Sequence, residues 1–588
     1  MLFTSEGKRP FETIRHKADV CVVGGGMSGL IAAVAAARHG AKVLLMQDRP
    51  VLGGNASGEI RMWIRGATHV SLELRETGIL NEIELENIYR NPTMNFSAWD
   101  ELLLRTVRSE KNIELLLNCS CLDCETEGSR ILTVTGWQTN TYTFHRVQAD
   151  IFIDCSGDAV LAPLSGAAYR IGREGRDEMD EYAAPEQPDR HTMGNSILIQ
   201  ARETDHPCVF KPVPGAYVYP DDESLYNKNH DFVHNGINFW WIELGGLQDS
   251  LKDVQPLGEE LMKIALGVWD HIKNYGDHGA ENFELDWIGF YPGKRESLRC
   301  EGDYMLNQRD LEEGHTFPDA VAYGGWTMDN HHPEGFAWNG YSSVHIDTAA
   351  SYHIPYRCLY SRNIDNLMFA GRNISASHMA MSSTRVMATC SVIGQAAGTA
   401  AALAAQYGCD PRGVNDHMEE LQRQLIADGC FIPGVFRLMK PLHSTFTAEQ
   451  TAMLQNGYER PVKGQENRIT LAEDAAFTVY TEGKGTLRLV WDIDFSRQSV
   501  ADKNRYRMFA MRCHIVAEDK ALNMPSPLVK DADICIKYAD GHTEEMTLRG
   551  NYRPMLLLPL GEGAVSVTVS ALRSYGGEGV GLYACDVF

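Results

Sequence analysis

The stretch "ADVCVVGGGMSGLIAAVAAARHGAKVLLMQDRPVLGGN", residues 18–55, decides the fold. Its apolar run from Asp19 to Val23 predicts a buried strand, and the glycines that follow predict a tight turn. Residues 28–38 are nearly all alanine or aliphatic, which indicates a buried helix that ends at Gly40. A second strand is expected over residues 42–46. Strands without polar alternation are typical of a parallel sheet that helices cover on both faces.

The glycine turn has the spacing of a dinucleotide-binding site. In Gly24-x-Gly26-x-x-Gly29, the first glycine makes the turn, the second lets a pyrophosphate approach the backbone, and the third lets the helix pack on the strand. The start of the helix, at Met27 and Ser28, offers free N–H groups and a partial positive charge to the phosphates. The alternative is a glycine-rich turn that only packs a helix.

Two features favour FAD over NAD as the dinucleotide. The pair Gly53-Gly54 directly after the second strand lets the backbone pass close to a long cofactor. Nucleotide-domain character also returns late, at "NLMFAGRNIS" (residues 366–375), and a small-residue helix is predicted from about Thr384 to Tyr407. We expect the N-terminus of that helix to stabilise charge on the flavin ring.

Length and composition limit the function classes. A chain of 588 residues is expected to form two or three domains, and its 44% hydrophobic and 22% charged content is typical of a globular protein. A net charge of −24 argues against nucleic acid and against anionic membranes. The N-terminus shows no signal core, and the apolar stretch from Gly394 to Ala405 is too short and alanine-rich for a membrane span. Scattered cysteines favour a reducing compartment, so we expect a cytoplasmic protein. Its expected partner is a small molecule, and homo-oligomerisation stays open.

The sequence divides into four expected segments. Residues 1–160 form the first part of an FAD-binding domain, in which strands are expected at 113–117 and 151–154 and a hairpin over 131–147. Residues 161–356 are rich in aromatics, histidines and prolines, and are interpreted as an inserted substrate domain. Residues 357–440 close the FAD-binding domain. Residues 441–588 alternate polar and apolar and predict a β-sandwich, with a hairpin turn at Asp540-Gly541.

Four pieces of the chain together resemble a known family. They are "VVGGGMSGLIAAVAAARHGAKVLLMQDRPVLGGNAS", "FIDCSGDAVLAPLSGA", "YPGKRESLRCEGDYMLNQRDL" and "NLMFAGRNISASHMAMSSTRVMATCSVIGQAAGTAAALA". They resemble bacterial FAD-dependent oxidoreductases distantly related to the flavoproteins of fumarate reductase and succinate dehydrogenase. The resemblance covers about residues 18–407. With it, the expected fold class is α/β: a Rossmann-like FAD-binding domain with an inserted α+β substrate domain and a C-terminal all-β sandwich. The end of the chain resembles galactose-binding-like jelly rolls. Such a module either binds carbohydrate or only packs against the flavin domain or a second subunit.

The end of the second strand holds Gln47 where an acid usually binds the adenosine ribose. The resemblance implies that Gln47 binds the ribose through its amide, which can accept from a hydroxyl without carrying charge. The alternative is that Asp48 does so. The residues expected to contact FAD are Gly24, Gly26, Met27, Ser28, Gly29, Gln47, Asp48, Gly53, Gly54, Asn55, Ser57, Cys121, Ser156, Gly157, Asp158, Gly371, Arg372, Val386 and Met387.

Candidate catalytic residues lie next to the expected flavin segments. His378 lies between "AGRN" and "STRV" and is the first candidate for proton transfer, because histidine as a residue type is suited to move a proton near neutral pH. Arg385 would hold a polar substrate or offset charge on the reduced ring. His331 and His332 in the inserted domain are the reserve candidates. The structural alternative is a buried histidine and an arginine that ties a loop.

No metal is expected. Asp329, His331 and His332 lie close in sequence, but no HxxxH or HExxH spacing is present. The pair Cys121 and Cys124 forms a CxxC without the second pair that zinc would need.

The class of substrate is inferred from the residue types of the expected substrate domain. Trp326, Trp338 and Tyr341 would supply a stacking wall for a sugar ring, so we expect hydride transfer between a hydroxylated, sugar-like substrate and the flavin. The alternative is reduction or desaturation next to a carboxylate or carbonyl, which Arg295, Arg299 and Arg385 would support if they converge on the flavin. A hypothesis of another class is a flavin-carrying carbohydrate-binding or scaffold protein.

Overall fold

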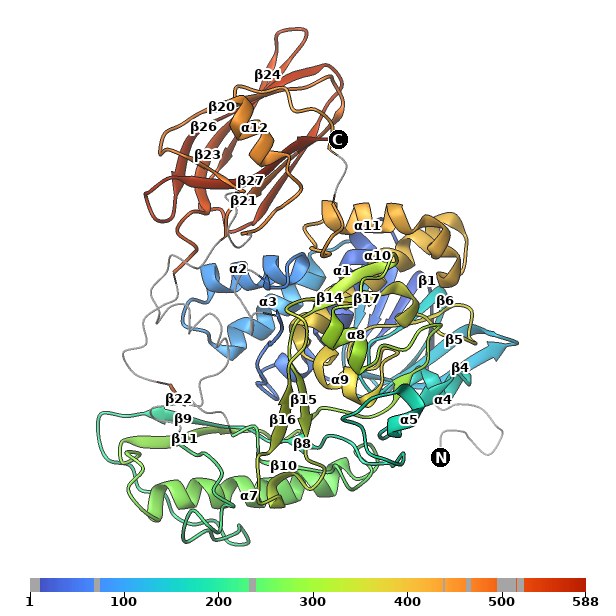
Figure 1. The fold of residues 1–588 in the computed structure, drawn as a ribbon, viewed down its shortest axis with the longest axis vertical. Coiled ribbons are helices and arrows are strands. Elements are labelled where there is room, and N and C mark those ends of the chain that lie inside the picture. Colours follow the sequence, from blue (N-terminus) through green and yellow to red (C-terminus); the bar gives the residue numbers. More distant parts are fainter. Residues whose placement is uncertain are drawn as a thin grey trace. The chain divides into compact units, whose positions relative to one another are not determined.

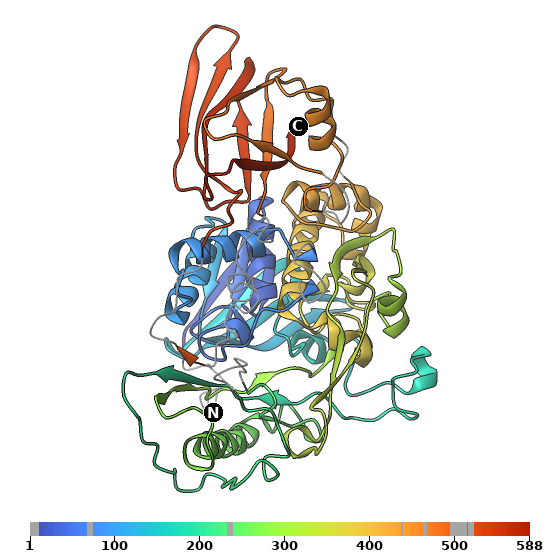
Figure 2. The same cartoon turned by 60° about the vertical axis from the view of Figure 1, so that its left-hand side comes forward.

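A computed structural model describes residues 11–67, 74–231, 239–436, 439–461, 467–493, 514–515 and 523–588 (Figures 1 and 2). The chain forms two compact units. The first comprises Met1–Val70, Asn95–Leu425 and Met508–Lys520, and the second comprises Ser71–Met94, Ile426–Arg507 and Ala521–Phe588.

The first unit is built on a seven-stranded sheet with the order β3-β2-β1-β6-β5-β4, and β18 pairs with β6. Its strands are β1 (Thr13–Val23), β2 (Val43–Met46), β3 (Ile113–Leu116), β4 (Cys119–Glu127), β5 (Arg130–Gln138), β6 (Thr143–Asp154) and β18 (Leu367–Phe369). The pairs β1–β2, β2–β3, β1–β6 and β6–β18 are parallel, while β4, β5 and β6 form antiparallel pairs. The expected α/β fold class is therefore confirmed.

Strand β6 differs from the expectation of two separate pieces. It runs without a break because β1 extends back to Thr13 and pairs with it from Phe144 to Asp154. Cys121 and Cys124 have the character of strand residues, but the sequence does not define the bounds of β4. Most of its residues are exposed or half-buried, so it lacks the apolar pattern of a buried strand.

Helices α1 (Met27–Arg38) and α10 (Met387–Tyr407) pack side by side against the sheet (Figure 1). Their backbones approach closely because α10 carries glycine at the contacts. A Cβ atom at Gly394 would lie 2.2 Å from the carbonyl oxygen of Ser28, and one at Gly398 would lie 2.1 Å from that of Ala32. Any side chain at these positions would push the helices apart.

Helix α10 is longer than the apolar stretch that the sequence analysis considered. Its 21 residues make it, among the described residues, the one helix with the length and hydropathy of a membrane span. However, 94% of the 18-residue apolar stretch within this helix is buried inside the protein. Such burial is what the core helix of a globular domain shows.

The helix predicted from Thr384 is interrupted at its start. Helix α9 (His378–Thr384) ends first, and Val386 adopts an extended conformation with φ −67° and ψ 144° before α10 begins. The interruption gives α10 an N-terminus of its own, with the partial positive charge that a helix start carries.

The remaining elements of the first unit are mostly short. The helices are α3 (Phe96–Arg108), α4 (Leu161–Ser165), α5 (Arg176–Met179), α7 (Val254–Asn274), α8 (Gln308–Glu313) and α11 (Met418–Ala427), with 3-10 turns η1 (Gly54–Ala56), η4 (Gly335–Ala337), η5 (Tyr356–Cys358) and η6 (Pro411–His417). The strands are β7 (Tyr169–Arg170), β8 (Asn195–Ser196), β9 (Ile199–Glu203), β10 (Glu243–Leu244), β11 (Phe283–Ile288), β12 (Gly293–Lys294), β13 (Arg299–Cys300), β14 (Ala320–Gly324), β15 (Met328–His331), β16 (Ser343–Ile346), β17 (Tyr352–Pro355) and β22 (His514–Ile515).

A separate core holds α7 against the β9–β11 pair (Figure 1). Trp269 and Val268 of α7 are fully buried there with Ala201 of β9 and Phe283 of β11. Strands β8, β10 and β12 form one small sheet, and β15 and β16 form another.

The second unit is a β-sandwich of two antiparallel four-stranded sheets (Figure 2). The sheet orders are β19-β27-β21-β25 and β20-β26-β23-β24. The bounds are β19 (Ile469–Leu471), β20 (Phe477–Tyr480), β21 (Gly485–Trp491), β23 (Val529–Tyr538), β24 (Thr543–Leu548), β25 (Met555–Leu560), β26 (Ala564–Ser574) and β27 (Val580–Val587), with helices α2 (Ile79–Arg90) and α12 (Ala448–Leu454). The predicted hairpin joins β23 to β24, with Gly541 at φ +90°.

Helix α2 belongs to the second unit although it lies early in the chain. Leu85 and Ile88 of α2 are buried in the sandwich core together with residues of both sheets. The sequence pattern alone did not separate this segment from residues 1–160.

We predict that Gly398→Val destabilises the protein by about 1–3 kcal/mol, because the new side chain would collide with the backbone of α1. Thermal unfolding measures the effect. Ala405→Val is the matched control, since Ala405 lies at the half-buried end of the same helix. Equal melting temperatures for the two variants would contradict the close approach of α1 and α10.

Candidate active site

One cavity of about 660 Å³ lies in the first unit, at the carboxyl ends of the parallel strands. Its lining includes Val23 and Met46, the last residues of β1 and β2, and Cys155, which follows β6. The residues at the starts of α1 and α10 also line it. In open α/β sheets, ligands bind at this edge of the sheet.

Most of the residues expected from the sequence line this cavity. They are Gly24, Gly26, Met27, Ser28, Gln47, Asp48, Gly53, Gly54, Asn55, Cys121, Ser156, Gly157, Asp158, Gly371, Arg372, Val386 and Met387, with Arg385 and His331. Gly29, Ser57, His332 and His378 are not among the lining residues.

The glycine turn leaves bare backbone at the cavity. Gly24 has φ +104°, and a Cβ atom there would lie 2.4 Å from the carbonyl oxygen of Cys155. At Gly26, the nearest atom to an added Cβ is the Cα of Gly54, at 3.9 Å, so the backbone of Gly26 stays open. Gly29 instead faces the turn, since its Cβ would lie 1.8 Å from the oxygen of Gly24. Gly29 thus allows the helix to pack on the strand, as the spacing predicts.

Gln47 braces the glycine turn. Its Oε1 accepts a hydrogen bond of 2.7 Å from the N–H of Gly25, and its Nε2 donates one of 3.1 Å to the carbonyl of Val51. Gln47 is 2% exposed, whereas the side chain of Asp48 is 54% exposed. Both residues line the cavity, so the ribose contact of Gln47 stays a prediction.

The cavity also holds a half-buried carboxylate, Asp158, with two cations. Arg372 donates to Asp158 at 2.6 Å, and Lys294 forms an ion pair with the same carboxylate. Burial alone would raise the pKa of Asp158, but the charges of Arg372 and Lys294 hold this pKa below its ordinary value. Asp158 therefore stays charged and positions both cations.

The lining fits FAD. The open glycine backbone and the start of α1 suit a pyrophosphate, and the start of α10 suits the flavin ring. Within the described part of the chain, the side chains of Arg372 and Arg385 each keep a buried Nε without a hydrogen-bond acceptor. Such donors call for an acceptor from a bound group.

A chain of alternating charges forms another part of the wall. Strand β15 carries Asp329 and His331. The Nδ1 of His331 lies 2.6 Å from Oε2 of Glu243, and its Nε2 lies 3.3 Å from Oδ2 of Asp329. Arg295 lies 3.3 Å from Glu243, and Arg385 donates to Asp329 at 3.2 Å. The sequence analysis missed Glu243, since it lies far from His331 in the chain.

The charges in this chain keep both carboxylates ionised. Burial alone would raise the pKa of Asp329, but His331 and Arg385 hold this pKa well below its usual range. The pKa of Glu243 is likewise lowered despite its burial, because of the charges of Arg295 and His331.

Tryptophan rings cover the wall beside these charges. Trp63, Trp240 and Trp326 all line the cavity, and the ring of Trp240 lies 5.2 Å from that of His331. Arg65 lies over the rings of Trp63 and Trp326, at 4.7 and 5.6 Å from their centroids. Of the aromatic residues expected at the substrate, Trp326 lines the cavity. Trp338 and Tyr341 are exposed and lie outside the lining.

His378 does not lie where the sequence analysis expected it. It is 2% exposed, and its Nδ1 and Nε2 lie 3.1 and 3.0 Å from Glu296 and Asn330. The first residue of α9 is thus held in a network of buried polar groups outside the cavity lining. His332 stacks on Trp338, with ring centroids 3.8 Å apart. The placement of His331 makes it the stronger candidate.

The arginines of "GKRESLR" divide between two environments. Arg295 lines the cavity, and it donates to Ser196 and to the carbonyl of Trp240. Arg299 lies outside the cavity and pairs with Glu174 at 2.9 Å. The pair Cys121 and Cys124 lies on β4, where burial raises the pKa of the Cys121 thiol well above its ordinary value, so Cys121 stays an unreactive part of the wall.

The parallel sheet, the glycine turn and the cavity between two helix N-termini define a dinucleotide-binding flavoprotein fold. The sequence model of the family described as "FAD dependent oxidoreductase" matches residues 19–425, more than half of the chain, and the chain belongs to this family. The protein is thus an FAD-dependent oxidoreductase, and the expected family and cofactor are confirmed.

Similar solved structures are distant. A geranylgeranyl bacteriochlorophyll reductase-like protein from Thermoplasma acidophilum is 12% identical, with 71% of this chain and 85% of that chain covered and a TM-score of 0.32. The myxobacterial chondrochloren halogenase CndH is 13% identical, with 70% and 81% covered and a TM-score of 0.33. The FrdA protein of Escherichia coli quinol fumarate reductase is 12% identical, with 71% and 75% covered and a TM-score of 0.27. No curated protein matches the chain.

We predict that Gln47→Ala weakens FAD binding by about tenfold, since it removes neutral hydrogen bonds worth about 0.5–1.5 kcal/mol each. Titration of the apoprotein with FAD measures the affinity. Asp48→Ala is the control. Our assignment of the ribose contact to Gln47 would be wrong if Asp48→Ala weakened FAD and Gln47→Ala did not.

Proposed function

We propose that the protein oxidises a hydroxylated, sugar-like substrate by removing a hydride from the carbon that bears a hydroxyl group. The observation that carries the proposal is the pair of His331 and Asp329 on the cavity wall, beside the residues that start α10. FAD, when bound, accepts the hydride. The remaining task of the protein is to bind the substrate and remove the hydroxyl proton.

His331 is suited to take that proton. Oxidation of an alcohol carbon requires the hydroxyl proton to leave, and a positioned histidine is the commonest acceptor. Glu243 is buried, ionised and 2.6 Å from Nδ1, so it accepts a hydrogen bond from this nitrogen and fixes the ring. The Nε2 atom, next to Asp329, is then the atom that receives the proton.

The walls of the cavity favour a polar substrate with apolar ring faces. Trp63, Trp240 and Trp326 offer flat aromatic surfaces, while Asp329 and His345 offer acceptors for hydroxyl groups. His345 lies opposite Asp329 on β16, and its Nε2 is 3.5 Å from Oδ1 of Asp329.

Reduction or desaturation beside a carboxylate is the second candidate function. It draws support from Arg295 and Arg385, which both line the cavity. Each of them already pairs with a protein carboxylate, Glu243 or Asp329, so a substrate carboxylate would compete with these partners and be repelled by Asp329. This arrangement favours a neutral hydroxylated substrate.

Screening sugars, polyols and organic acids for anaerobic bleaching of the bound flavin tests the substrate class. We expect bleaching by members of the first two groups. Bleaching by organic acids alone would support the second function. A flavin that no compound in the panel reduces would favour a carrier or scaffold role and contradict the proposal.

We predict that His331→Ala keeps FAD but slows single-turnover flavin reduction by about 10²–10⁴-fold, the usual effect of losing a general base. His378→Ala is the matched control, since His378 is buried outside the cavity lining, and its rate per bound FAD should stay near wild type. If flavin reduction were slow in His378→Ala and near wild type in His331→Ala, the assignment of proton transfer to His331 would be wrong and His378 would be the base.

A further inference from the structure

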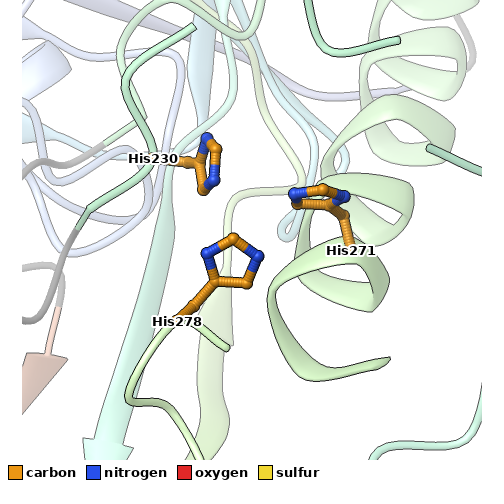
Figure 3. A group of neighbouring side chains, drawn as sticks. All are labelled: His230, His271 and His278. Carbon is orange, nitrogen blue, oxygen red and sulfur yellow. The ribbon is translucent and has the colours of Figure 1, made fainter. Parts of the chain in front are cut away.

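Three histidines form a cluster that the proposed reaction does not use (Figure 3). His230 lies on the loop before β10, His271 lies in the last turn of α7, and His278 lies in the turn after that helix. One ring nitrogen of each lies within 4.8 Å of one nitrogen of each of the others. None of the three lines the active-site cavity.

Each ring is oriented by a backbone carbonyl. The Nδ1 of His230 lies 2.8 Å from the carbonyl oxygen of Lys228, and the Nδ1 of His271 lies 2.7 Å from that of Tyr219. The Nε2 of His278 lies 2.9 Å from the carbonyl of Tyr275. A carbonyl can only accept, so these three nitrogens carry the protons.

The three remaining nitrogens therefore carry lone pairs. They are Nε2 of His230, Nε2 of His271 and Nδ1 of His278. His271 is 1% exposed, and its Nε2 has no hydrogen-bond partner among the residues that the structure describes. A buried polar atom without a partner is costly, and a histidine that donates its other nitrogen to a carbonyl is the usual form of a metal ligand.

A carboxylate completes the set. The Oδ1 of Asp222 lies 3.4 Å from Nε2 of His271 and 3.7 Å from Nε2 of His230. Three imidazoles and one carboxylate are a ligand set that suits zinc. The end of α7 adds partial negative charge from its last carbonyls, which favours a cation.

The backbone around the cluster is built to hold His278 in place. After α7 ends, Gly276 adopts φ +102°, a conformation that favours glycine, and this turn brings the chain back toward the helix. The Nζ of Lys273 donates to the carbonyls of Ala280, Glu281 and Phe283, which fixes the segment after His278.

We propose that His230, His271 and His278 bind one zinc ion, with Asp222 as the fourth ligand. Tetrahedral zinc with bonds of about 2.0–2.1 Å places its nitrogen ligands about 3.3 Å apart. The ligand nitrogens lie within 4.8 Å of one another, so they need to approach by at most about 1.5 Å to reach this geometry. With four protein ligands the site is closed, so the ion is structural and joins the loop of Asp222 and His230 to the end of α7.

The sequence gives no expectation of a metal here, because the three histidines form no short metal-binding motif. His271 and His278 lie seven residues apart, and His230 lies on another segment. The only signal in the sequence is the density of histidine in this region. The ligand set appears when α7 packs against β9 and β11.

Metal analysis of the purified holoenzyme, supplied with zinc and then desalted, tests the site. We expect about one zinc ion per chain in the wild type and less than about a tenth of that in His271→Ala and His278→Ala. X-ray absorption at the zinc edge should show light-atom neighbours at about 2.0–2.1 Å. His206→Ala is the matched control, since His206 is exposed in the same region and pairs only with its neighbour Asp205.

A second measurement does not depend on the variants. Removal of zinc from the wild type with a chelator should lower its melting temperature, and added zinc should restore it, because a ligand that binds only the folded state stabilises it. Wild-type protein that retains no zinc after desalting would overturn the proposal. So would a control variant that loses as much zinc as His271→Ala.

Discussion

The architecture of the active site depends on one steric constraint, the contact between the glycine turn and the end of β6. The carbonyl of Cys155 lies where residue 24 would place a side chain, so only glycine lets β1 and β6 end side by side. Gly29 then seats α1 on the same turn, and Gly394 seats α10 on α1. As a result, two helix N-termini face one cavity, and their partial positive charges add where an anionic cofactor and a reduced ring carry negative charge.

The polar side chains beside the start of α10 are held in place by ion pairs with one another. Arg295, Glu243, His331, Asp329 and Arg385 follow one another, and their signs alternate once His331 carries the proton that it takes. Buried ions are stable only when paired, so each member of this chain depends on its neighbours. Because the groups are already oriented in the folded protein, little reorganisation is needed when a proton enters the chain at His331.

The sequence allowed the prediction of features that arise locally. The glycine turn, α1 and the strands next to them are specified by neighbouring residues, so fold class and most of the cofactor lining could be read from spacing. Trp240 and Glu243 could not, since Trp240 lines the cavity and Glu243 contacts His331 behind the wall only when β10 pairs with β8. The placement of His378 depends on packing in the same way. It lies between the two flavin segments in the sequence, but its ring is held by Glu296, between β12 and β13, outside the cavity lining.

The position of helix α2 in the chain affects the order in which the second unit can fold, because α2 is synthesised early and the strands that it packs against are synthesised late. The sandwich needs residues 71–94 from near the start of the chain and strands that end at Val587. During translation, Leu85 and Ile88 are synthesised long before the sandwich strands that bury them. Their apolar side chains stay exposed until those strands are made. Pairings between residues so distant in sequence form slowly and expose the nascent chain to aggregation. Burial of Leu85 and Ile88 cannot be completed before the strands of the sandwich core have been synthesised.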